Sequence, residues 1–371
     1  MRYFIARRRG QLRCCRRLPS GYDAYHCSVH SKPARRNESC LACGPSGAST
    51  TNVSSGEYMK ILVTGGAGFI GSFLCDYLIA KGHQVTAYDD LSLGRRRNIE
   101  HQLNAGALEF IEGDILDESR FEDVVKSGNF ECVFHMAANS DIARSHASPS
   151  IDLKKTFLTT FQVLEAARKF DIKQIVFAST SAIYGETKGK VAETYGPLVP
   201  ISHYGAGKLA SEAFISSYCE NYGIKAWITR FPNVVGPRAT HGAVYDFVRK
   251  LIATPGLLNV LGDGTQVKPY LYVEDLVRAI LLVWEKTDQK INIYNVGADT
   301  RSTVADIAQI VIEESGERAE IAYTGGDRGW IGDVPKFEYD TSALNSLGWQ
   351  PTMTSDDAIR AAARAIWKEQ R

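Results

Sequence analysis

Short apolar runs alternate with longer amphipathic stretches along residues 59–300. The apolar runs have the length of buried strands and lie at 60–63, 84–89, 110–113, 132–138, 175–180, 226–230 and 292–296. Between them, apolar residues recur at helical spacing, most clearly over 69–80, 153–170 and 273–284. Strands that alternate with helices pack as a parallel sheet covered by helices on both faces. The pattern therefore predicts an α/β fold built on a doubly wound parallel sheet.

The pattern becomes mixed after residue 236. The elements predicted there are a helix over 247–252, a strand over 259–261 before the turn cluster 262–265, and helices over 303–315 and 354–368. We expect residues 59–236, with 270–297 returning to them, to form the larger domain. Residues 237–371 would then mainly form a smaller C-terminal mixed α/β lobe, with a ligand site in the cleft between the two.

A glycine-rich turn follows the first predicted strand. Gly65, Gly68 and Gly71 form a G-x-x-G-x-x-G pattern, and Phe69 and Ile70 begin the predicted helix. Glycines here allow a sharp turn and a close backbone approach to a pyrophosphate, and the helix N-terminus offers N–H groups to the phosphates. A strand, this turn and a helix in that order predict a Rossmann-type dinucleotide site.

The second predicted strand ends in two acidic residues, Asp89 and Asp90. Asp89 lies about 20 residues beyond the glycine turn, where a carboxylate accepts hydrogen bonds from the adenosine ribose hydroxyls, and Asp90 can share this role. NAD is therefore favoured over NADP. The arginines at 95–97 leave an alternative open, since they could bind a 2′-phosphate, although a solvated loop is the simpler interpretation.

Polar residues follow several of the predicted strands. Asp114, Asn139, Thr180 and Asn233 each stand at or just past a strand end. Ligands of doubly wound sheets gather beyond the carboxyl ends of the strands. These four residues are therefore candidate site residues.

Tyr204 and Lys208 are four residues apart in a helical stretch, which places a phenol and an ammonium on one face. Tyrosine in water has a pKa of about 10 and is a poor base. A nearby cation favours the phenolate, so we expect Lys208 to lower the pKa of Tyr204 toward neutral pH. The spacing alone often occurs by chance, and it gains meaning from the dinucleotide turn upstream.

With these motifs the chain resembles the extended short-chain dehydrogenase/reductases of the NAD-dependent epimerase/dehydratase family, most of all the UDP-glucose 4-epimerases. The resemblance runs from residue 59 to about residue 371. The motifs that carry it are TGGAGFIGS (64–72), VTAYDDLSLG (85–94), GDI (113–115), FHMAA (134–138), ASTSAIYG (178–185), YGAGK (204–208), RFPNVVGPR (230–238), VLGDGTQVKPYLYVEDLVRAI (260–280) and GDVPKFEYDTSAL (332–344).

The resemblance implies an NAD-dependent enzyme that inverts C4 of a UDP-hexose through a transient 4-keto intermediate. Tyr204 would remove the proton of the C4 hydroxyl, Thr180 would share a hydrogen bond with that hydroxyl, and Lys208 would hydrogen-bond the nicotinamide ribose. The implied cofactor-binding residues are Gly65, Gly68, Phe69, Ile70, Asp89, Asp90, Asp114, Ile115, Ala137, Ala138, Tyr204 and Lys208. The implied substrate-binding residues are Asn139, Thr180, Asn233, Lys268 and Arg328.

Four positions depart from the family pattern. Lys268 and Pro269 stand where an Arg-Asp pair is usual, so the phosphate contact becomes a point charge that cannot fork. Thr156 replaces an asparagine, and Trp330 lengthens the spacing between Arg328 and the following Gly-Asp. Phe337 lies near the position whose bulk limits room around the sugar C2 substituent, which disfavours an N-acetyl group unless Phe337 is an ordinary core aromatic.

Other functions on the same scaffold stay open. The 4,6-dehydratases place an acidic pair after the catalytic threonine, whereas Ser181 and Ala182 follow Thr180 here. Uronic acid epimerases, decarboxylases and 4-keto reductases use the same hydroxyl, tyrosine and lysine. A regulator that only binds NAD would need none of this proton chemistry.

The first 58 residues have a different composition. They contain ten basic residues against three acidic ones and five of the eight cysteines. We expect a disordered leader or a misassigned start before Met59. Two alternatives are an organelle transit peptide and a small zinc site built on Cys27, His30, Cys40 and Cys43.

Charge and hydropathy limit the remaining classes. The formal net charge of the chain is +1, which does not suggest nucleic acid as a partner. No apolar run reaches the roughly 18 residues of a membrane span. The scattered Cys75, Cys132 and Cys219 are typical of reduced thiols in a cytoplasmic enzyme. No metal is expected after residue 58, and the family resemblance implies a homodimer through helices containing 153–168 and 204–220.

Overall fold

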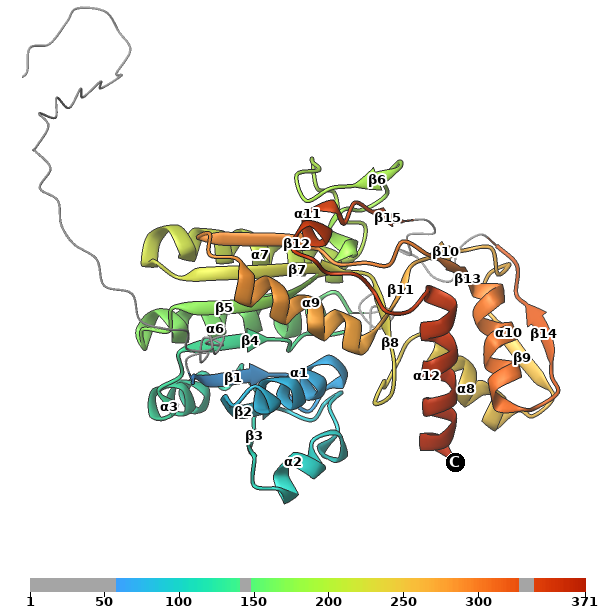
Figure 1. The fold of residues 1–371 in the computed structure, drawn as a ribbon, viewed down its shortest axis with the longest axis horizontal. Helices are drawn as coiled ribbons and strands as arrows, with labels where there is room; N and C mark the ends of the chain where they lie inside the picture. The colour runs from blue at the N-terminus through green and yellow to red at the C-terminus, as the bar shows by residue number, and fades with distance from the viewer. Residues whose placement is uncertain (1–57, 141–147, 327–336) are drawn as a thin grey trace, which may run out of the picture. The chain divides into compact units, whose positions relative to one another are not determined.

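A computed structural model describes residues 58–140, 148–326 and 337–371 of the chain. Its centre is a seven-stranded sheet in which every neighbouring pair is parallel (Figure 1). From one edge to the other the strands are β12 (Ile291–Asn295), β7 (Lys225–Phe231), β5 (Gln174–Thr180), β4 (Cys132–His135), β1 (Lys60–Thr64), β2 (Gln84–Asp89) and β3 (Leu108–Glu112). The doubly wound sheet predicted from the sequence is confirmed.

The order of the strands reverses beside β1. The chain runs outward from β1 to β2 and β3, then returns to place β4 on the other side of β1. At such a switch point the loops beyond the carboxyl ends diverge and leave a crevice for ligands. The dinucleotide turn predicted after β1 therefore lies where this sheet opens.

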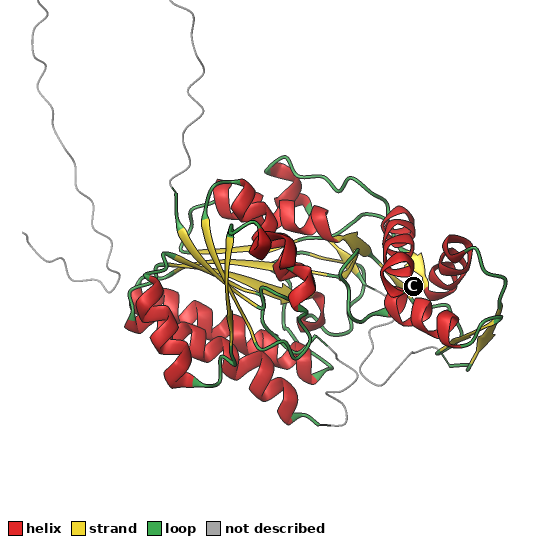
Figure 2. Cartoon of the chain, turned by 90° about the horizontal axis from the view of Figure 1, so that it is seen from below, coloured by secondary structure: helices red, strands yellow, loops and turns green. Residues whose placement is uncertain are grey.

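Alternation of side chains along the buried strands creates two apolar cores. In β1, Ile61 and Val63 face the core formed with α1 (Phe69–Ala80) and α9 (Val273–Lys286), while Leu62 faces the opposite core. The opposite core is covered by α3 (Glu118–Gly128), α6 (Thr159–Lys169) and α7 (His203–Tyr222). Figure 2 shows helices on both faces of the sheet.

A third apolar core belongs to the C-terminal part of the chain. The helices α8 (Ala243–Ala253), α10 (Val304–Ser315) and α12 (Ser355–Gln370) enclose it (Figure 1). The strands paired outside the large sheet are β8 (Asn233–Val235) with β11 (Tyr270–Tyr272), β9 (Leu257–Val260) with β14 (Glu320–Tyr323), β10 (Val267–Lys268) with β13 (Ser302–Thr303), and β6 (Lys190–Val191) with β15 (Glu338–Tyr339). Short helices are α2 (Glu100–Asn104), α5 (Ser150–Asp152) and α11 (Ser342–Ser346).

The predicted helix over 153–170 proves to be composite. After α5 comes a π-helical turn, Leu153–Leu158, and only then α6. The hydroxyls of Thr159 and Thr160 donate to the carbonyls of Lys155 and Thr156, four residues earlier. Apolar spacing does not register such a local widening, which is frequent at functional sites.

Within the described ranges, no helix has both the length and the apolar character needed to cross a membrane.

Candidate active site

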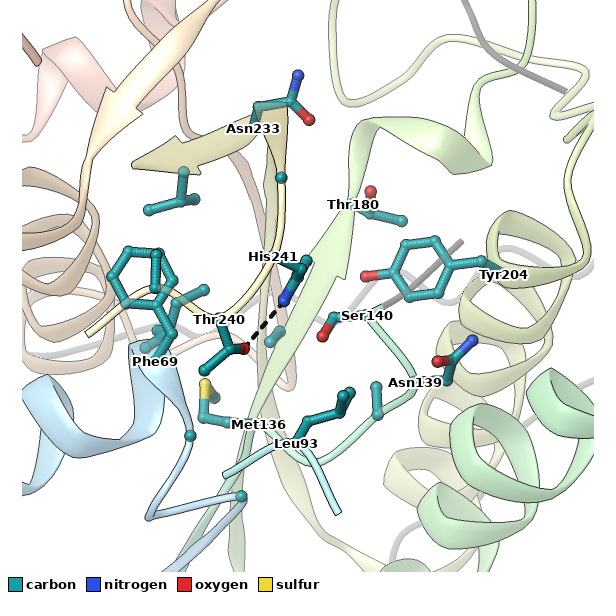
Figure 3. A pocket seen from close by; sticks show the side chains of 18 of the residues that line it. Phe69, Leu93, Met136, Asn139, Ser140, Thr180, Tyr204, Asn233, Thr240 and His241 are labelled. Carbon is teal, nitrogen blue, oxygen red and sulfur yellow. Dashed lines mark hydrogen bonds between the residues drawn. The ribbon is translucent and has the colours of Figure 1, made fainter. Parts of the chain in front are cut away.

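One cavity of about 840 Å³ opens over the carboxyl ends of the sheet. Its walls include every candidate site residue within the described ranges; Arg328 lies outside those ranges. Figure 3 shows Thr180 and Tyr204 on one wall, with Phe69 and Met136 opposite and Asn233 above them. Residues far apart in the sequence thus meet in one site, as expected for side chains that follow the carboxyl ends of strands in a doubly wound sheet.

The glycine turn predicted to bind a dinucleotide forms one end of the cavity. Gly65 adopts φ +70°, and a Cβ on it would lie 2.8 Å from the backbone nitrogen of Ala137 on the neighbouring strand end. A Cβ on Gly71 would lie 2.1 Å from the carbonyl oxygen of Gly65. Only glycine fits these two positions, and α1 begins immediately beside the turn. This cradle fits the phosphates of a dinucleotide.

Asp89 holds the turn together at the end of β2. Its carboxylate accepts hydrogen bonds from the backbone N–H of Ala67 at 3.0 Å and of Leu91 at 2.8 Å. Burial raises the pKa of Asp89, while these two bonds oppose that shift. The carboxylate therefore stays oriented toward the cavity at the position expected for the ribose contact.

Lys155, which was not predicted from the sequence, bridges two candidate acids. Its Nζ lies 2.8 Å from Oδ2 of Asp90 and 2.7 Å from Oδ2 of Asp114. Burial opposes a charged Asp90, but the hydrogen bonds from Lys155 and Ser92 together with the Lys155 charge outweigh it, and the pKa of Asp90 is lowered. The bridge ties β2 and the β3 end to the π-helical turn, so this end of the cavity is held from three segments.

The arginines that left NADP open have other contacts. Arg95 donates from Nη2 to the hydroxyl of Tyr245 at 3.0 Å. The guanidinium of Arg96 lies 5.3 Å from the centre of the Phe110 ring. None of Arg95, Arg96 and Arg97 lines the cavity, whereas Asp89 and Asp90 do, which agrees with NAD as the cofactor.

The catalytic candidates converge at the other end of the cavity. Thr180 is the last residue of β5, and its side chain lines the cavity together with that of Tyr204. The Nζ of Lys208 donates to the carbonyl of Ala178 at 2.7 Å and lies 5.9 Å from the centre of the Tyr204 ring. The Ser202 hydroxyl caps α7 through the N–H of Gly205 at 3.0 Å, which fixes the start of the helix that carries both residues.

Electrostatics in the site differ from the sequence-based expectation. Burial and the charge of Asp152 raise the pKa of Tyr204, and the Thr180 side chain only partly opposes them. Burial also lowers the pKa of Lys208 to about 7, against the charges of Glu212 and Asp152. The expected lowering of the Tyr204 pKa by Lys208 is therefore wrong for this site, because desolvation is the largest influence on both side chains.

A buried histidine packs next to the catalytic candidates. His135 is fully buried, and its ring nitrogens are hydrogen-bonded with Thr64 Oγ1 at 2.7 Å and Thr160 Oγ1 at 3.1 Å. Its ring stacks on Phe177, over which the Lys208 Nζ lies at 4.6 Å. Burial and the Lys208 charge lower the pKa of His135 to about 3. No sequence signal pointed to this role, because a histidine inside a strand resembles ordinary core.

The C-terminal part of the chain supplies the remaining wall. Asn233 begins β8 and Lys268 ends β10, so both candidate substrate residues reach the cavity (Figure 3 for Asn233). Phe337 both lines the cavity and packs against Tyr184 and Tyr339, with ring centres 5.7 Å and 4.7 Å away. It is thus a wall residue held in place by an aromatic cluster. The loop that contains Thr240 and His241 also lines the cavity and was not predicted.

Within the part of the chain that the structure describes, no cluster of His, Cys, Asp or Glu suits a metal ion. The zinc hypothesis concerns Cys27, His30, Cys40 and Cys43, which lie outside the described residues. Cys75, Cys132 and Cys219 are buried thiols, and burial raises the pKa of each.

The chain is similar to known proteins over most of its length. Residues 61–297 match the model of the NAD dependent epimerase/dehydratase family. A UDP-glucose 4-epimerase of Mycolicibacterium smegmatis is 31% identical over 307 residues, which cover 81% of this chain and 96% of that protein.

Two solved structures show the same fold. A UDP-glucose 4-epimerase of Thermotoga maritima, solved with UDP-glucose, is 33% identical with a TM-score of 0.76, covering 84% of this chain and 100% of that one. The UDP-glucose 4-epimerase of Thermus thermophilus, solved with NAD, is 31% identical with a TM-score of 0.75, covering 83% of this chain and 99% of that one.

Proposed function

Since this chain belongs to the NAD dependent epimerase/dehydratase family, we propose that it inverts C4 of a UDP-hexose by way of a transient 4-keto sugar. The observation that carries the proposal is the meeting of Thr180, Tyr204 and Lys208 in the cavity whose other end is the dinucleotide turn. Relatives named as UDP-glucose 4-epimerases support UDP-hexose as the substrate class.

The proton steps fall to residues of this chain. Tyr204 takes the proton of the C4 hydroxyl, and Thr180 shares a hydrogen bond with that hydroxyl from the same wall of the cavity. Lys208 supplies a positive charge under the site and donates to the cofactor ribose. NAD held beside these residues would supply a reversible hydride acceptor for C4 and the positive charge of an oxidised nicotinamide ring.

The remaining wall of the cavity positions the nucleotide. Asn233 and Lys268 contact the diphosphate, and we extend this role to Arg328 from the family resemblance. Residues 59–236 with 270–297 bind NAD, and the smaller C-terminal lobe binds the sugar nucleotide. We further propose that the enzyme acts in the cytoplasm as a homodimer joined through α6 and α7.

The residues after Thr180 favour epimerisation over dehydration. Elimination across C5 and C6 needs an acid and a base near the catalytic threonine, whereas Ser181 and Ala182 line that part of the cavity. Uronic acid epimerases and 4-keto reductases use the same three catalytic side chains, so the sugar must be identified by assay.

The test is Tyr204→Phe, assayed by NMR for C4 inversion on a panel of UDP, dTDP and GDP sugars. We expect turnover to fall at least about 100-fold while NAD content is unchanged, since the phenol moves a proton but contributes little to cofactor affinity. Tyr218→Phe is the matched control: it lies on the same helix, bonds to Glu165 at 2.6 Å, and is not part of the cavity wall. Unchanged turnover in Tyr204→Phe would refute the catalytic assignment.

A further inference from the structure

Asp152 lies behind the cavity wall, beside the part of α7 that carries Tyr204 and Lys208. Its side chain is 1% exposed. Oδ1 accepts hydrogen bonds from Nδ2 of Asn139 at 3.1 Å and from Oγ1 of Thr156 at 2.8 Å. Oδ2 is buried and has no hydrogen-bond partner within the described ranges. Neither donor is a cation. A buried carboxylate is costly to keep charged when no cation lies nearby.

Gly207 explains how Asp152 comes close to the catalytic helix. A Cβ at Gly207 would lie 3.1 Å from Cγ2 of Thr156 and 3.4 Å from the carbonyl oxygen of Asp152. The missing side chain lets α7 pack directly on the segment that contains these two residues. Gly207 immediately precedes Lys208 and is three residues beyond Tyr204, so the same contact places the Asp152 backbone beside the turn of α7 that carries both, and the Asp152 charge acts on both side chains.

The other charged groups around Lys208 are already paired. Glu212, one turn further along α7, accepts from the Nε and Nη2 of Arg230 on β7 at 3.0 Å and 2.7 Å. On β4, His135 is held neutral by burial and by the Lys208 charge. On β5, the Lys208 Nζ donates to the carbonyl of Ala178 and lies over the ring of Phe177, and neither group carries a charge. Among the described residues that act on Lys208, Asp152 is thus the anion without a cation of its own.

We propose that Asp152 is a positioning residue that serves as the counter-ion of Lys208 and keeps its ammonium charged in the working enzyme. The inference rests on the proposed function, because Lys208 must be charged to serve the cofactor ribose and the Tyr204 oxygen. Asp152 acts through Lys208 and does not touch the substrate.

Two opposing effects set the charge of Lys208. Burial favours the neutral amine, and the carboxylates of Glu212 and Asp152 favour the ammonium. The Asp152 charge also raises the pKa of Tyr204. Removing that charge therefore lowers the pKa of both groups, which moves the two limbs of a pH–rate profile in the same direction.

The first experiment is Asp152→Asn, which removes the charge but preserves the size of the side chain and an oxygen acceptor. We expect the pH profile of kcat to move to lower pH by about 1 unit. On the alkaline side, turnover would be about tenfold lower than in the wild type, with little loss at the acidic side. A uniform loss at every pH would instead indicate a structural role and overturn the proposal.

A second readout does not depend on turnover. In protein labelled with ¹³C-lysine, NMR titration of the Lys208 Cε, assigned with Lys208→Met, reports the pKa of this side chain directly. We expect a pKa near 7 in the cofactor-free wild type and a value about 1 unit lower in Asp152→Asn. An unchanged Lys208 pKa would overturn the proposal. Should Asp152→Asn not fold, Asp152→Ser also removes the charge and leaves a hydroxyl for the same titration.

Asp275→Asn provides the control. Asp275 is also 1% exposed, bonds to Thr352 from α9, and does not line the cavity. It should lower thermal stability without moving the pH profile. Failure of the proposed function and failure of this inference are distinguishable. An active Tyr204→Phe variant would refute the function. An inactive Tyr204→Phe variant, together with an Asp152→Asn variant whose pH profile and Lys208 pKa do not shift, would refute only the counter-ion role.

Discussion

At the scale of single residues, burial dominates the chemistry of this site. His135 is fully buried and Lys208 is 1% exposed, so desolvation disfavours the charged form of each. Compensation comes from hydrogen bonds and from neighbouring charges, not from water. Both side chains belong to one connected layer, in which the His135 ring stacks on Phe177 and the Lys208 ammonium lies over the same ring.

This layer predicts a loss of stability in mild acid. The pKa of His135 is lowered to about 3 in the folded protein, below the unfolded value of about 6.5. The unfolded chain therefore binds a proton that the folded chain excludes, and stability falls as pH drops below about 6.5. Between pH 7 and pH 5 this histidine should account for about 2 kcal/mol of lost unfolding free energy.

Urea titrations at pH 7 and pH 5 measure this effect. His135→Gln preserves hydrogen-bonding capacity but cannot ionise, so its stability should fall by about 2 kcal/mol less than that of the wild type over the same interval. An equal loss in both proteins would contradict the assignment. His101, which is exposed and bonds to Asp76, offers a control substitution on the surface.

The residues that could be predicted from the sequence are those whose proposed role shows in the spacing of one stretch of chain. Tyr204 and Lys208 follow helical spacing, and Asp89 stands at a fixed distance from the glycine turn, so one stretch of chain is enough to recognise them. Asp152 and His135 showed no such signal. Their roles depend on contacts with α7 and β5 that only the packed structure creates, and a buried charge cannot be distinguished from an exposed one in a sequence.

At the scale of elements, the unit β1–turn–α1 shows the clearest link between sequence and geometry. Gly65 has a left-handed φ of +70° and lies close to the Ala137 backbone. A side chain there is therefore disfavoured both by the backbone conformation and by the lack of space. The bounds of α1 and β2 agree with the sequence prediction. The two-residue strands, such as β10 and β6, were not predicted, because they are too short to show any periodicity.

We predict that Gly65→Ala removes NAD binding far beyond its effect on stability. The new Cβ would force the turn away from Ala137 and displace the phosphate cradle, so NAD affinity measured by calorimetry should fall at least about tenfold. Gly82→Ala is the matched control. Gly82 also has a left-handed φ, +90°, but a Cβ there would meet nothing within 4 Å. It should cost about 1 kcal/mol of stability and leave NAD affinity unchanged.

At the scale of the whole molecule, the strand order explains how one cavity can hold both proposed ligands. The crevice beside β1 and β4 receives the glycine turn from one side and the Thr180 strand end from the other. Short segments of the C-terminal part, including β8 and β10, then close the same cavity with Asn233 and Lys268. The proposed cofactor and sugar sites are therefore contiguous, as hydride transfer in both directions requires.

The proposed homodimer follows from the outer face of α6 and α7. Phe214 is 40% exposed there, and its ring packs edge-on against those of Phe157 and Phe161, 5.1 Å and 6.0 Å away. Tyr222 on α7 and Leu153 in the π-helical turn are also exposed on these segments. Exposed aromatic and aliphatic side chains on two packed helices are typical of a surface that a second copy covers.

Phe214→Glu tests this interface by placing a charge at its centre. Burying an unpaired carboxylate against the partner's aromatic rings should weaken dimerisation at least about 100-fold, so the variant should sediment as a monomer at micromolar concentration. Tyr323→Glu, at a 43% exposed aromatic side chain on β14, adds the same charge on another surface. This control should sediment with the same mass as the wild-type protein. Lys155 and Thr156 lie in the π-helical turn that this face covers, and Lys155 bridges the two candidate acids Asp90 and Asp114. A monomeric variant should therefore also bind NAD less tightly. A Phe214→Glu protein that stays dimeric would place the interface on another surface.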